Sequence, residues 1–498
     1  MADITYICKR TVVSTKPVQP GKHCSLSVLD RLMEQNHLRS VYYFRTPGGR
    51  EPGELTKKLR ESLSEMLTCF PIVTGRLLKD PKGHWMIKCN DAGVRMVEAR
   101  IKGSVEDWLK SVDREKELML VHWEEMYHKP YFWSTFYVQV KKKVSLDQWL
   151  IKHTFHFMTF LFLLEFHLCD WDLSLLKPCK KLGFCSFFIA FQITEFGEGG
   201  LAIGLSCFHL LADPTCATMF VKAWADVTLT GKMLNHPLFH QLPPRRPGRK
   251  NPNHEPYMEL INCYKPIADK TNLVSDTKHA TIALAFSDPM VRACMANGQA
   301  MNAFDQSSPS PFEALAGLFW VCISKLKGAG DGLIDMSICS DMRNVLHLDN
   351  GFFGNCMVYN KVNSKSLKEH KLSDVAKAIG EVMAKMDNDG ITDLIEWLEH
   401  NDYQSPPPMN GCELMCASLE AVDPYLAVFE EGFVPIRVSS YVEPVVGAGH
   451  VLVLPSPPCE GPLSRTVMVT LPEDEAARLC EDDLILHFSP TILVGVNN

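Results

Sequence analysis

The sequence predicts an α/β fold built in two halves, and three observations support this expectation. Helix-like and strand-like patterns alternate along both halves of the 498-residue chain, which is the order typical of α/β architecture. A hydrophobic share of 46% with a charged share of 22% is globular and excludes a disordered, collagenous or fibrous protein. A proline-rich stretch over residues 243–256 separates the two halves.

The first half opens with two strand–helix pairs. The second helix is expected to end before Phe70 and Pro71, because the residue that precedes a proline disfavours helical backbone. In chain order, the strand, helix, strand and helix are predicted over residues 11–15, 27–35, 41–45 and 54–66.

A β-hairpin is predicted next, but its first strand is interrupted. Residues 133–139 and 193–196 read as one continuous strand if the segment between them is left out. A glycine-rich turn over residues 197–200 then leads into a return strand over residues 201–207.

The interrupting segment, residues 140–192, differs from the rest of the chain. It holds nine of the 26 Phe residues within 53 positions and shows neither helical nor strand periodicity. Gln139-Val140 can be encoded as CAG-GTN, a splice-donor sequence, and Phe191-Gln192 as TTY-CAG, a splice acceptor. Our hypothesis is a retained intron translated in frame.

Two alternatives for residues 140–192 stay open at this stage. The first is a membrane-spanning element, but its uncharged run, residues 157–164, is far shorter than the ~20 residues that cross a bilayer. The second is a genuine surface insertion or lid.

The proline-rich stretch predicts a linker between the halves. Residues 243–256 contain five Pro, one Gly and four basic residues, a composition that we expect to form neither helix nor strand. Beyond it, the predicted elements are helices over residues 311–325 and 372–386 and strands over residues 333–339, 436–442, 449–454 and 465–471.

One pair of residues, a histidine and an aspartate, is a candidate for acid–base catalysis. His209 follows the return strand, and Asp213 comes four residues later. A neutral imidazole, with an ordinary pKa of about 6.5, can act as a general base, and a nearby carboxylate can orient it. The HxxxD spacing also arises by chance, so a purely structural histidine is the alternative.

Further motifs occur on both sides of the HxxxD pattern at residues 209–213, namely at residues 70–77, 311–320, 341–343 and 351–355. Together and in this order, the sequence patterns resemble the BAHD family of plant acyl-CoA-dependent acyltransferases. The resemblance implies two similar domains, each with a mixed sheet and flanking helices, joined by a crossover loop. The implied units are an N-terminal domain 1–242, a linker 243–275 and a C-terminal domain 276–498.

The resemblance also implies a reaction. His209 would deprotonate a hydroxyl or amine acceptor, which then attacks an acyl-CoA thioester, with acyl-CoA as co-substrate and no bound cofactor. In the family the motif aspartate is mainly structural, so Asp213 is expected to fix the loop through a charge pair and to orient rather than to react. The site would lie in a channel between the two domains of a cytosolic monomer.

Two departures from the family pattern are visible. Pro214 stands where the family has glycine after the aspartate. The second family motif, DFGWG, is degenerate and has lost its aspartate, so Arg343 or another arginine is expected to lack its partner. The residues at the matching place are Phe429, Glu430, Glu431, Gly432 and Phe433.

These departures, with residues 87–95 and 465–472, look like the eceriferum/glossy branch of the family. That branch implies a different class of function, a non-catalytic accessory protein for very-long-chain fatty-acyl elongation in wax synthesis. Its implied place is the endoplasmic reticulum, beside a condensing enzyme.

Composition narrows the remaining possibilities. A net charge of −7 gives no reason to expect a nucleic-acid partner, which would favour a basic face. The 18 Cys are scattered through a long chain, which favours a reduced cytosolic protein over a disulfide scaffold. His236 and His240 flank a proline and so do not present two ligands on one helix face, and Cys412 with Cys416 has no partner pair nearby at zinc spacing, so no metal is expected. No transmembrane segment is expected either.

Overall fold

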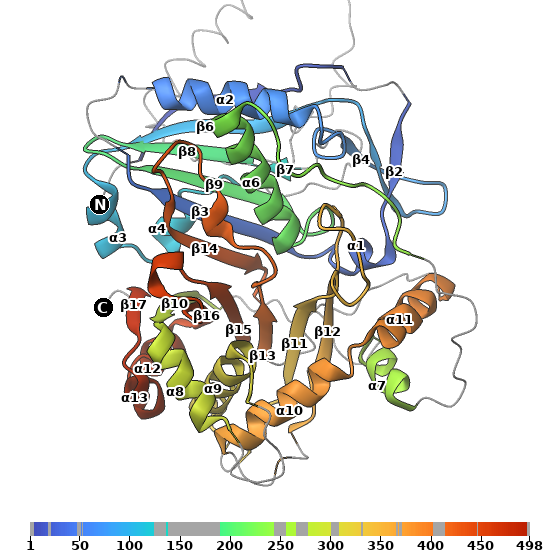
Figure 1. Cartoon of the computed structure of the whole chain (residues 1–498), viewed down its shortest axis with the longest axis vertical. Helices are drawn as coiled ribbons and strands as arrows, with labels where there is room; N and C mark the ends of the chain where they lie inside the picture. The colour runs from blue at the N-terminus through green and yellow to red at the C-terminus, as the bar shows by residue number, and fades with distance from the viewer. Residues whose placement is uncertain are drawn as a thin grey trace, which may run out of the picture.

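The computed structural model arranges the chain as two large β-sheets surrounded by helices (Figure 1). Among the described residues, each large sheet has seven strands and a third sheet has three. Both large sheets mix parallel and antiparallel pairs, so the predicted α/β fold with mixed sheets is confirmed. The structure describes residues 4–17, 21–46, 51, 53–123, 136–137, 190–243, 255–264, 277–299, 308–329, 332–364, 367, 371–401, 414–445 and 447–495.

The first large sheet is formed mainly by the first half of the chain. Its strands, in spatial order, are β1 (Ile4–Val12), β6 (Val94–Ile101), β8 (Ala190–Phe196), β9 (Leu201–Phe208), β3 (His37–Phe44) and β14 (Pro435–Glu443), with β7 (Phe136–Tyr137) also paired to β9. The small sheet beside it contains β2 (His23–Ser25), β5 (Trp85–Lys88) and β4 (Arg76–Lys79).

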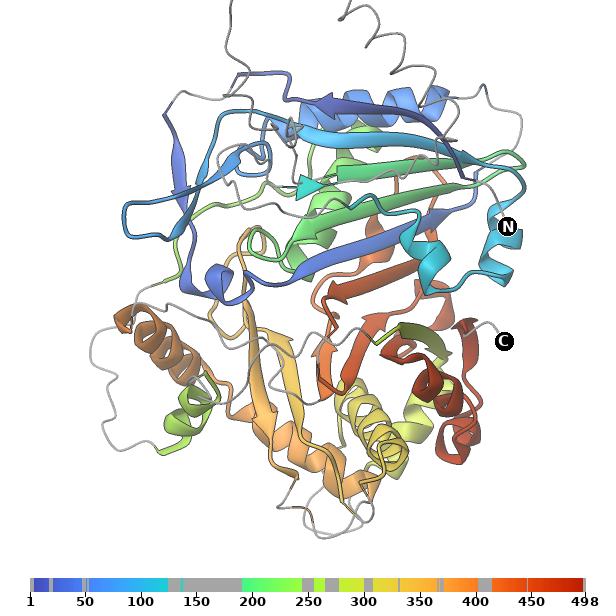
Figure 2. The ribbon, with the colours of Figure 1, turned by 180° about the vertical axis from the view of Figure 1, so that it is seen from behind.

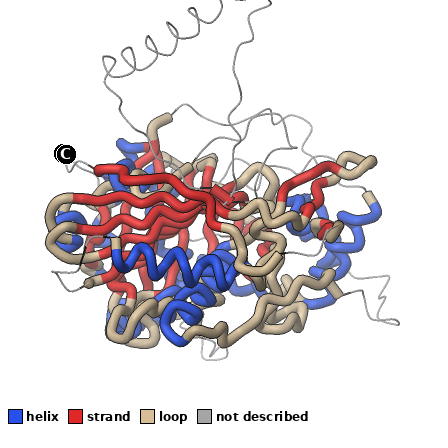
Figure 3. The backbone as a smooth tube through the Cα atoms, turned by 90° about the horizontal axis from the view of Figure 1, so that it is seen from above, coloured by secondary structure: helices blue, strands red, loops and turns tan. Residues whose placement is uncertain are grey.

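Two long helices, α2 (Glu54–Leu67) and α6 (Pro214–Thr230), pack together over one face of this sheet (Figures 1 and 3). Phe191 of β8 lies against Phe220 and Trp224 of α6, with ring centroids 5.6 and 4.9 Å apart. The indole N–H of Trp224 donates to the backbone oxygen of Leu59 in α2 at 2.9 Å. The apolar face of α6 therefore ties the sheet and α2 into one core.

The second large sheet belongs to the second half of the chain. Its order is β12 (Met357–Val362), β11 (Met336–Asp341), β13 (Leu414–Ser418), β15 (Gly449–Pro455), β16 (Arg465–Pro472), β10 (His279–Phe286) and β17 (Thr491–Val494). The helices around it are α8 (Asp288–Asn297), α9 (Pro311–Leu326), α10 (Leu372–Ala384), α12 (Glu473–Leu479) and α13 (Asp483–Phe488). Beyond the β12 edge, α7 (Glu255–Tyr264) packs on α11 (Asn388–His400).

Strand β14 links the halves, because it comes from the second half and completes the first sheet. It pairs antiparallel with β3, with Ser439 opposite Val41. The short helices α3 (Val105–Lys110) and α4 (Arg114–Leu118) lie on the face of that sheet away from α6 (Figure 2). They contact β17 and β10 of the second sheet, so the two sheets are joined on more than one side.

Most predicted elements are present, with shifted ends, but two expectations need correction. The first strand ends at Val12 rather than covering residues 11–15, because Ser14 turns away and donates from its backbone N–H and hydroxyl to Asp91 at 3.1 and 2.7 Å. The predicted linker contains helix α7. Pro256 lies in its first turn, where the missing N–H has no intrahelical partner to lose.

The predicted hairpin strand exists as two separate pieces. β7 and β8 both pair with β9, on the edge that β3 does not occupy. Residues 140–189, most of the predicted insertion, lie outside the described residues, and the last three residues of the predicted insertion, Ala190–Gln192, belong to β8. Within the described part of the chain, no helix is long and apolar enough to cross a bilayer.

Candidate active site

His209 lies where β9 ends and is almost wholly buried, with 1% of its surface exposed. Its backbone N–H donates to the oxygen of Asn36 at 3.0 Å, at the start of β3. The backbone at His209 is therefore fixed by the same two strands that form the centre of the first sheet.

The imidazole of His209 is held by Asn355, a residue from the second half of the chain. Its Nδ1 lies 2.8 Å from Oδ1 of Asn355. The Nδ2 of Asn355 donates to the backbone oxygen of His209 at 2.7 Å and to Oδ1 of Asp30 at 2.9 Å. Both of these partners accept hydrogen bonds, so the amide oxygen must face the ring. Nδ1 of His209 then carries the proton, and Nε2 is the nitrogen that can accept one.

Asp30 anchors this arrangement from helix α1 (Val28–Leu32). Its Oδ1 accepts both the backbone N–H and the side-chain Nδ2 of Asn355, each at 2.9 Å. Its Oδ2 accepts the backbone N–H of Ser27 at 2.7 Å in a capping box. Burial raises the pKa of Asp30, although the hydrogen bonds from Asn355 and Ser27 oppose that rise.

Burial lowers the pKa of His209 below the ordinary value for histidine, and the charge of Asp213 and the bond to Asn355 only partly oppose it. The imidazole is therefore neutral near pH 7, which is the state that a general base needs.

Asp213 does not contact the imidazole through its carboxylate, and its hydrogen bonds are made elsewhere. Its Oδ1 caps helix α6 by accepting the backbone N–H of Cys216 at 2.8 Å. Its Oδ2 accepts the N–H of Cys356 at 2.9 Å. Arg343 binds both oxygens, at 2.9 and 3.0 Å. The orienting contact expected of Asp213 is thus made by Asn355, while the expected structural charge pair is present.

Arg343 has two carboxylate partners, which corrects the expectation that it would lack one. Besides Asp213, it donates to Oδ2 of Asp341 at 2.5 Å, and Thr215 donates to the same oxygen at 2.5 Å. We call Asp213, Arg343, Asp341 and Thr215 the Asp213 cluster. Burial raises the pKa of Asp341. Burial also acts to raise the pKa of Asp213, but the charge and hydrogen bonds of Arg343, with the backbone N–H groups of Cys216 and Cys356, outweigh it, so this pKa is lowered.

Pro214, the first departure from the family pattern, is the first residue of α6. Proline suits this position, because its fixed φ is helical and the absent N–H would have no intrahelical partner. The substitution therefore fits the local backbone.

The degenerate motif lies against the first sheet and not against His209. Phe429 is buried between Phe44 and Trp224, with ring centroids at 5.6 and 5.0 Å. Glu430 pairs with Lys58 of α2 at 3.0 Å. Glu431 and Gly432 are exposed, Gly432 has a φ of 80°, and Phe433 is half-buried. Phe429 and Glu430 thus hold the motif loop against the first sheet, α6 and α2, away from His209.

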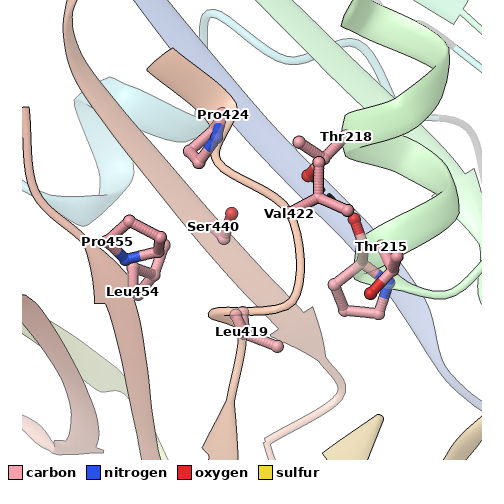
Figure 4. A pocket seen from close by; sticks show the side chains of 9 residues that line it. Thr215, Thr218, Leu419, Val422, Pro424, Ser440, Leu454 and Pro455 are labelled. Atoms are coloured by element: carbon pink, nitrogen blue, oxygen red, sulfur yellow. Dashed lines mark hydrogen bonds between the residues drawn. The ribbon is translucent and has the colours of Figure 1, made fainter. Parts of the chain in front are cut away.

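A pocket opens at the start of α6, between the two halves of the chain (Figure 4). Thr215 and Thr218 of α6 lie on one side of it, Leu454 and Pro455 of β15 on the other, and Ser440 of β14 between them. Six of its nine lining residues are apolar, and the other three carry hydroxyls. It adjoins the Asp213 cluster through Thr215.

The remaining candidates are the pairs Cys412 with Cys416 and His236 with His240. Cys416 is buried in β13 and Cys412 lies outside the described residues. His236 and His240 are exposed. In the described ranges, no group of three or more His, Cys, Asp or Glu side chains could hold a metal ion.

Comparison with known proteins identifies the family. The sequence profile of the Transferase family matches residues 2–142 and 180–483. The chain belongs to this family, the BAHD acyltransferases. The profile passes over residues 143–179, which lie inside the predicted insertion.

Curated relatives of this BAHD protein cover almost its whole length. It is 27% identical to Protein ECERIFERUM 26 of Arabidopsis thaliana, over 94% of this chain and 92% of the relative. It is 24% identical to rosmarinate synthase of Plectranthus scutellarioides, over 94% of this chain and 96% of that enzyme.

Solved structures show the same fold. Vinorine synthase superposes with a TM-score of 0.63 at 17% identity and covers 99% of this chain and 100% of its own. TRI101 of F. sporotrichioides, in complex with coenzyme A and T-2, gives 0.62 at 14% identity, over 95% of this chain and 100% of its own. At these identities the likeness concerns the fold alone.

The sequence identified His209 and Asp213 but missed two residues of the site. Asn355 lay in a stretch quoted only for the family resemblance, and Asp30 had no signal except its position after Ser27 at a helix start. Neither lies near His209 in sequence, so only the fold brings them together.

Proposed function

We propose that this protein transfers an acyl group from an acyl-CoA thioester to a hydroxyl or amine acceptor, with His209 as the general base. The observation that carries the proposal is the buried, neutral imidazole whose Nδ1 is held by Asn355. Membership of the BAHD family and a fold shared with TRI101, solved with coenzyme A, support the reaction class.

In the proposed reaction, Nε2 of His209 takes the proton from the acceptor. The acceptor oxygen or nitrogen then attacks the thioester carbonyl, and the tetrahedral oxyanion collapses with cleavage of the C–S bond. The imidazolium returns its proton to the leaving thiolate, which departs as coenzyme A.

The proposed site draws on both proposed domains, 1–242 and 276–498. The first supplies His209, Asp213 and Asp30, and the second supplies Arg343 and Asn355. Specificity for donor and acceptor would depend on the shape of the channel between them.

The test is acyl transfer by the purified protein with aliphatic and hydroxycinnamoyl thioesters and mixed alcohols and amines. His209→Ala is expected to lower the rate by a factor of about 10²–10⁴ while the melting temperature stays close to that of the parent. His240→Ala, at an exposed histidine, is the control and should transfer at the parental rate. Transfer that survives in His209→Ala would refute the role of the base.

Asp30 is proposed to act through Asn355 as a positioning residue. Asp30→Ala leaves the amide free to turn, so some imidazole would take the wrong tautomer. We expect kcat to fall by a larger factor than KM changes, and we expect the pH dependence of the rate to shift. Asp30→Asn keeps one acceptor oxygen toward Asn355 and should restore part of kcat. An equal loss in both variants, with an unchanged pH profile, would point to a merely structural role.

The second candidate function is the non-catalytic accessory role in fatty-acyl elongation, favoured by the similarity to Protein ECERIFERUM 26. In this case we propose that the chain works at the cytosolic side of the endoplasmic reticulum beside a condensing enzyme. A plant that lacks the gene would show an altered wax profile, and His209→Ala would restore it. If His209→Ala fails to restore the wax profile although its protein level is normal, the acyltransferase function is favoured over the accessory role.

A further inference from the structure

Two segments far apart in sequence lie along the same edge of β9. β7 places Phe136 opposite Cys207 and Tyr137 opposite Ser206. β8 places Ala190 opposite the same Ser206 and continues to Glu195 opposite Leu201. The other edge of β9 is filled by β3 along its whole length. The two segments therefore meet end to end at Ser206.

The registers of the two segments agree with one uninterrupted strand. Ile193 lies opposite Ile203. If Gln139 were bonded directly to Ile193, Gln139 would fall opposite Gly204 and Tyr137 opposite Ser206. That is the partner that Tyr137 already has. A junction longer or shorter by one residue would turn each upstream side chain to the opposite face.

The residue at the junction is also preserved. Gln192 is buried, and its Nε2 donates to the backbone oxygen of Met119 at 3.2 Å and to the hydroxyl of Thr194 at 3.1 Å. In the joined strand, Gln139 takes this position with an identical side chain. The hydrogen bonds from this position to Met119 and to Thr194 can therefore be kept.

The family profile gives independent support. It matches the chain up to residue 142 and again from residue 180. The unmatched part lies wholly within residues 140–192.

We infer that residues 140–192 are an insertion into a single strand. The last three of them, Ala190–Gln192, occupy the positions in β8 that residues 137–139 would take. The chain that lacks the insertion, with Gln139 bonded to Ile193, is the form in which that strand is continuous. The consequence reaches the candidate site, because β9 leads directly to His209. A continuous neighbour along β9 would fix the backbone that carries the imidazole. The inference concerns folding and holds whether or not the protein transfers acyl groups.

The experiment compares the full chain with two deletions. The first lacks residues 140–192, and the second lacks residues 141–192 and so keeps one extra residue at the junction. We expect the first deletion to melt about 5 °C or more above the full chain, with higher soluble yield and slower amide hydrogen exchange over residues 201–208. The second deletion, with its upstream faces inverted, should melt below the first.

Equal melting temperatures and equal exchange in the full chain and the first deletion would overturn the inference. Equal values in the two deletions would also overturn it, because the register would then not matter. Sequencing transcripts across the codon for Gln139 tests the origin of the segment. A transcript that joins it to Ile193 is expected, and retention of residues 140–192 in every transcript would refute a retained intron.

Discussion

Two buried carboxylate–arginine clusters join the halves of this protein on opposite faces of the first sheet. In the Asp213 cluster, one arginine serves two carboxylates, and Asp213 also caps α6. In the second, the Glu117 cluster, one carboxylate from α4 accepts hydrogen bonds from Tyr43, Arg437, Ser439 and Tyr441. Three of these four partners lie on β14, the strand that comes from the second half of the chain.

The difference lies in how the charge is balanced and in what each cluster adjoins. Glu117 is fully buried and has one cation and three hydroxyls, whereas Arg343 lies between two acids, one of which follows His209 by four residues. The HxxxD aspartate is thus held by the same kind of interaction that fixes a purely structural joint. Proximity in sequence to the proposed base, His209, does not by itself give a carboxylate a catalytic role.

The largest effect is expected from Arg343→Ala. It leaves Asp213 and Asp341 buried without a cation, which should lower the free energy of unfolding by about 3–5 kcal/mol. Denaturant unfolding measures the loss. Arg343→Lys should recover only part of it, because an ammonium cannot bind both oxygens of Asp213 as a planar fork does. A loss of under about 1 kcal/mol in the alanine variant would show that the cluster is not a structural joint.

A smaller effect is expected from Glu117→Gln. The amide oxygen can still accept from the hydroxyls, but Arg437 is left without its counter-charge, so the free energy of unfolding should fall by about 2 kcal/mol. Tyr441→Phe, which removes one of the hydroxyls, is the matched control and should cost about 1 kcal/mol. If the two variants are equally stable, the charge of Glu117 adds nothing to the joint.

Acid is expected to destabilise the folded protein through His209. Because burial lowers the pKa of His209 in the folded state, the unfolded chain takes up a proton below about pH 6.5 before the folded chain does. Stability contributed by this group is therefore present above pH 6.5 and is lost as the pH falls. His209→Asn cannot titrate, so its melting temperature should fall less than that of the parent between pH 7 and pH 5. An identical fall in both proteins would contradict the sign.

The smallest effect is expected from Glu430→Ala, at the exposed ion pair of the degenerate motif. Glu430→Ala breaks the pair with Lys58, whose side chain is 48% exposed, so unfolding should change by less than about 1 kcal/mol. Phe429→Ala, at a buried ring of the same loop, should cost about 3–5 kcal/mol. If Glu430→Ala lowered the free energy of unfolding by several kcal/mol, the pair with Lys58 would stabilise the fold as much as the Asp213 cluster does.

The local patterns predicted much of the fold because they act over short distances. Helix α9 begins at Pro311 after the cap Ser310 and closes a box with Glu313, all within four residues. The return strand, predicted over residues 201–207, is β9 at Leu201–Phe208. Helix α7 was missed because its buried Tyr264 is held by a hydrogen bond to Tyr359, a residue far along the chain.

By itself, the sequence determined the α/β class, the family resemblance, the histidine at a strand end, and the places where the chain departs from its family. Only the tertiary structure decided which side chains surround that histidine. Asn355 and Asp30 reach His209 from two other parts of the chain, and Arg343 finds its carboxylates there too. The physical reason is that a buried polar group must be satisfied, and which distant group satisfies it depends on how the two sheets pack.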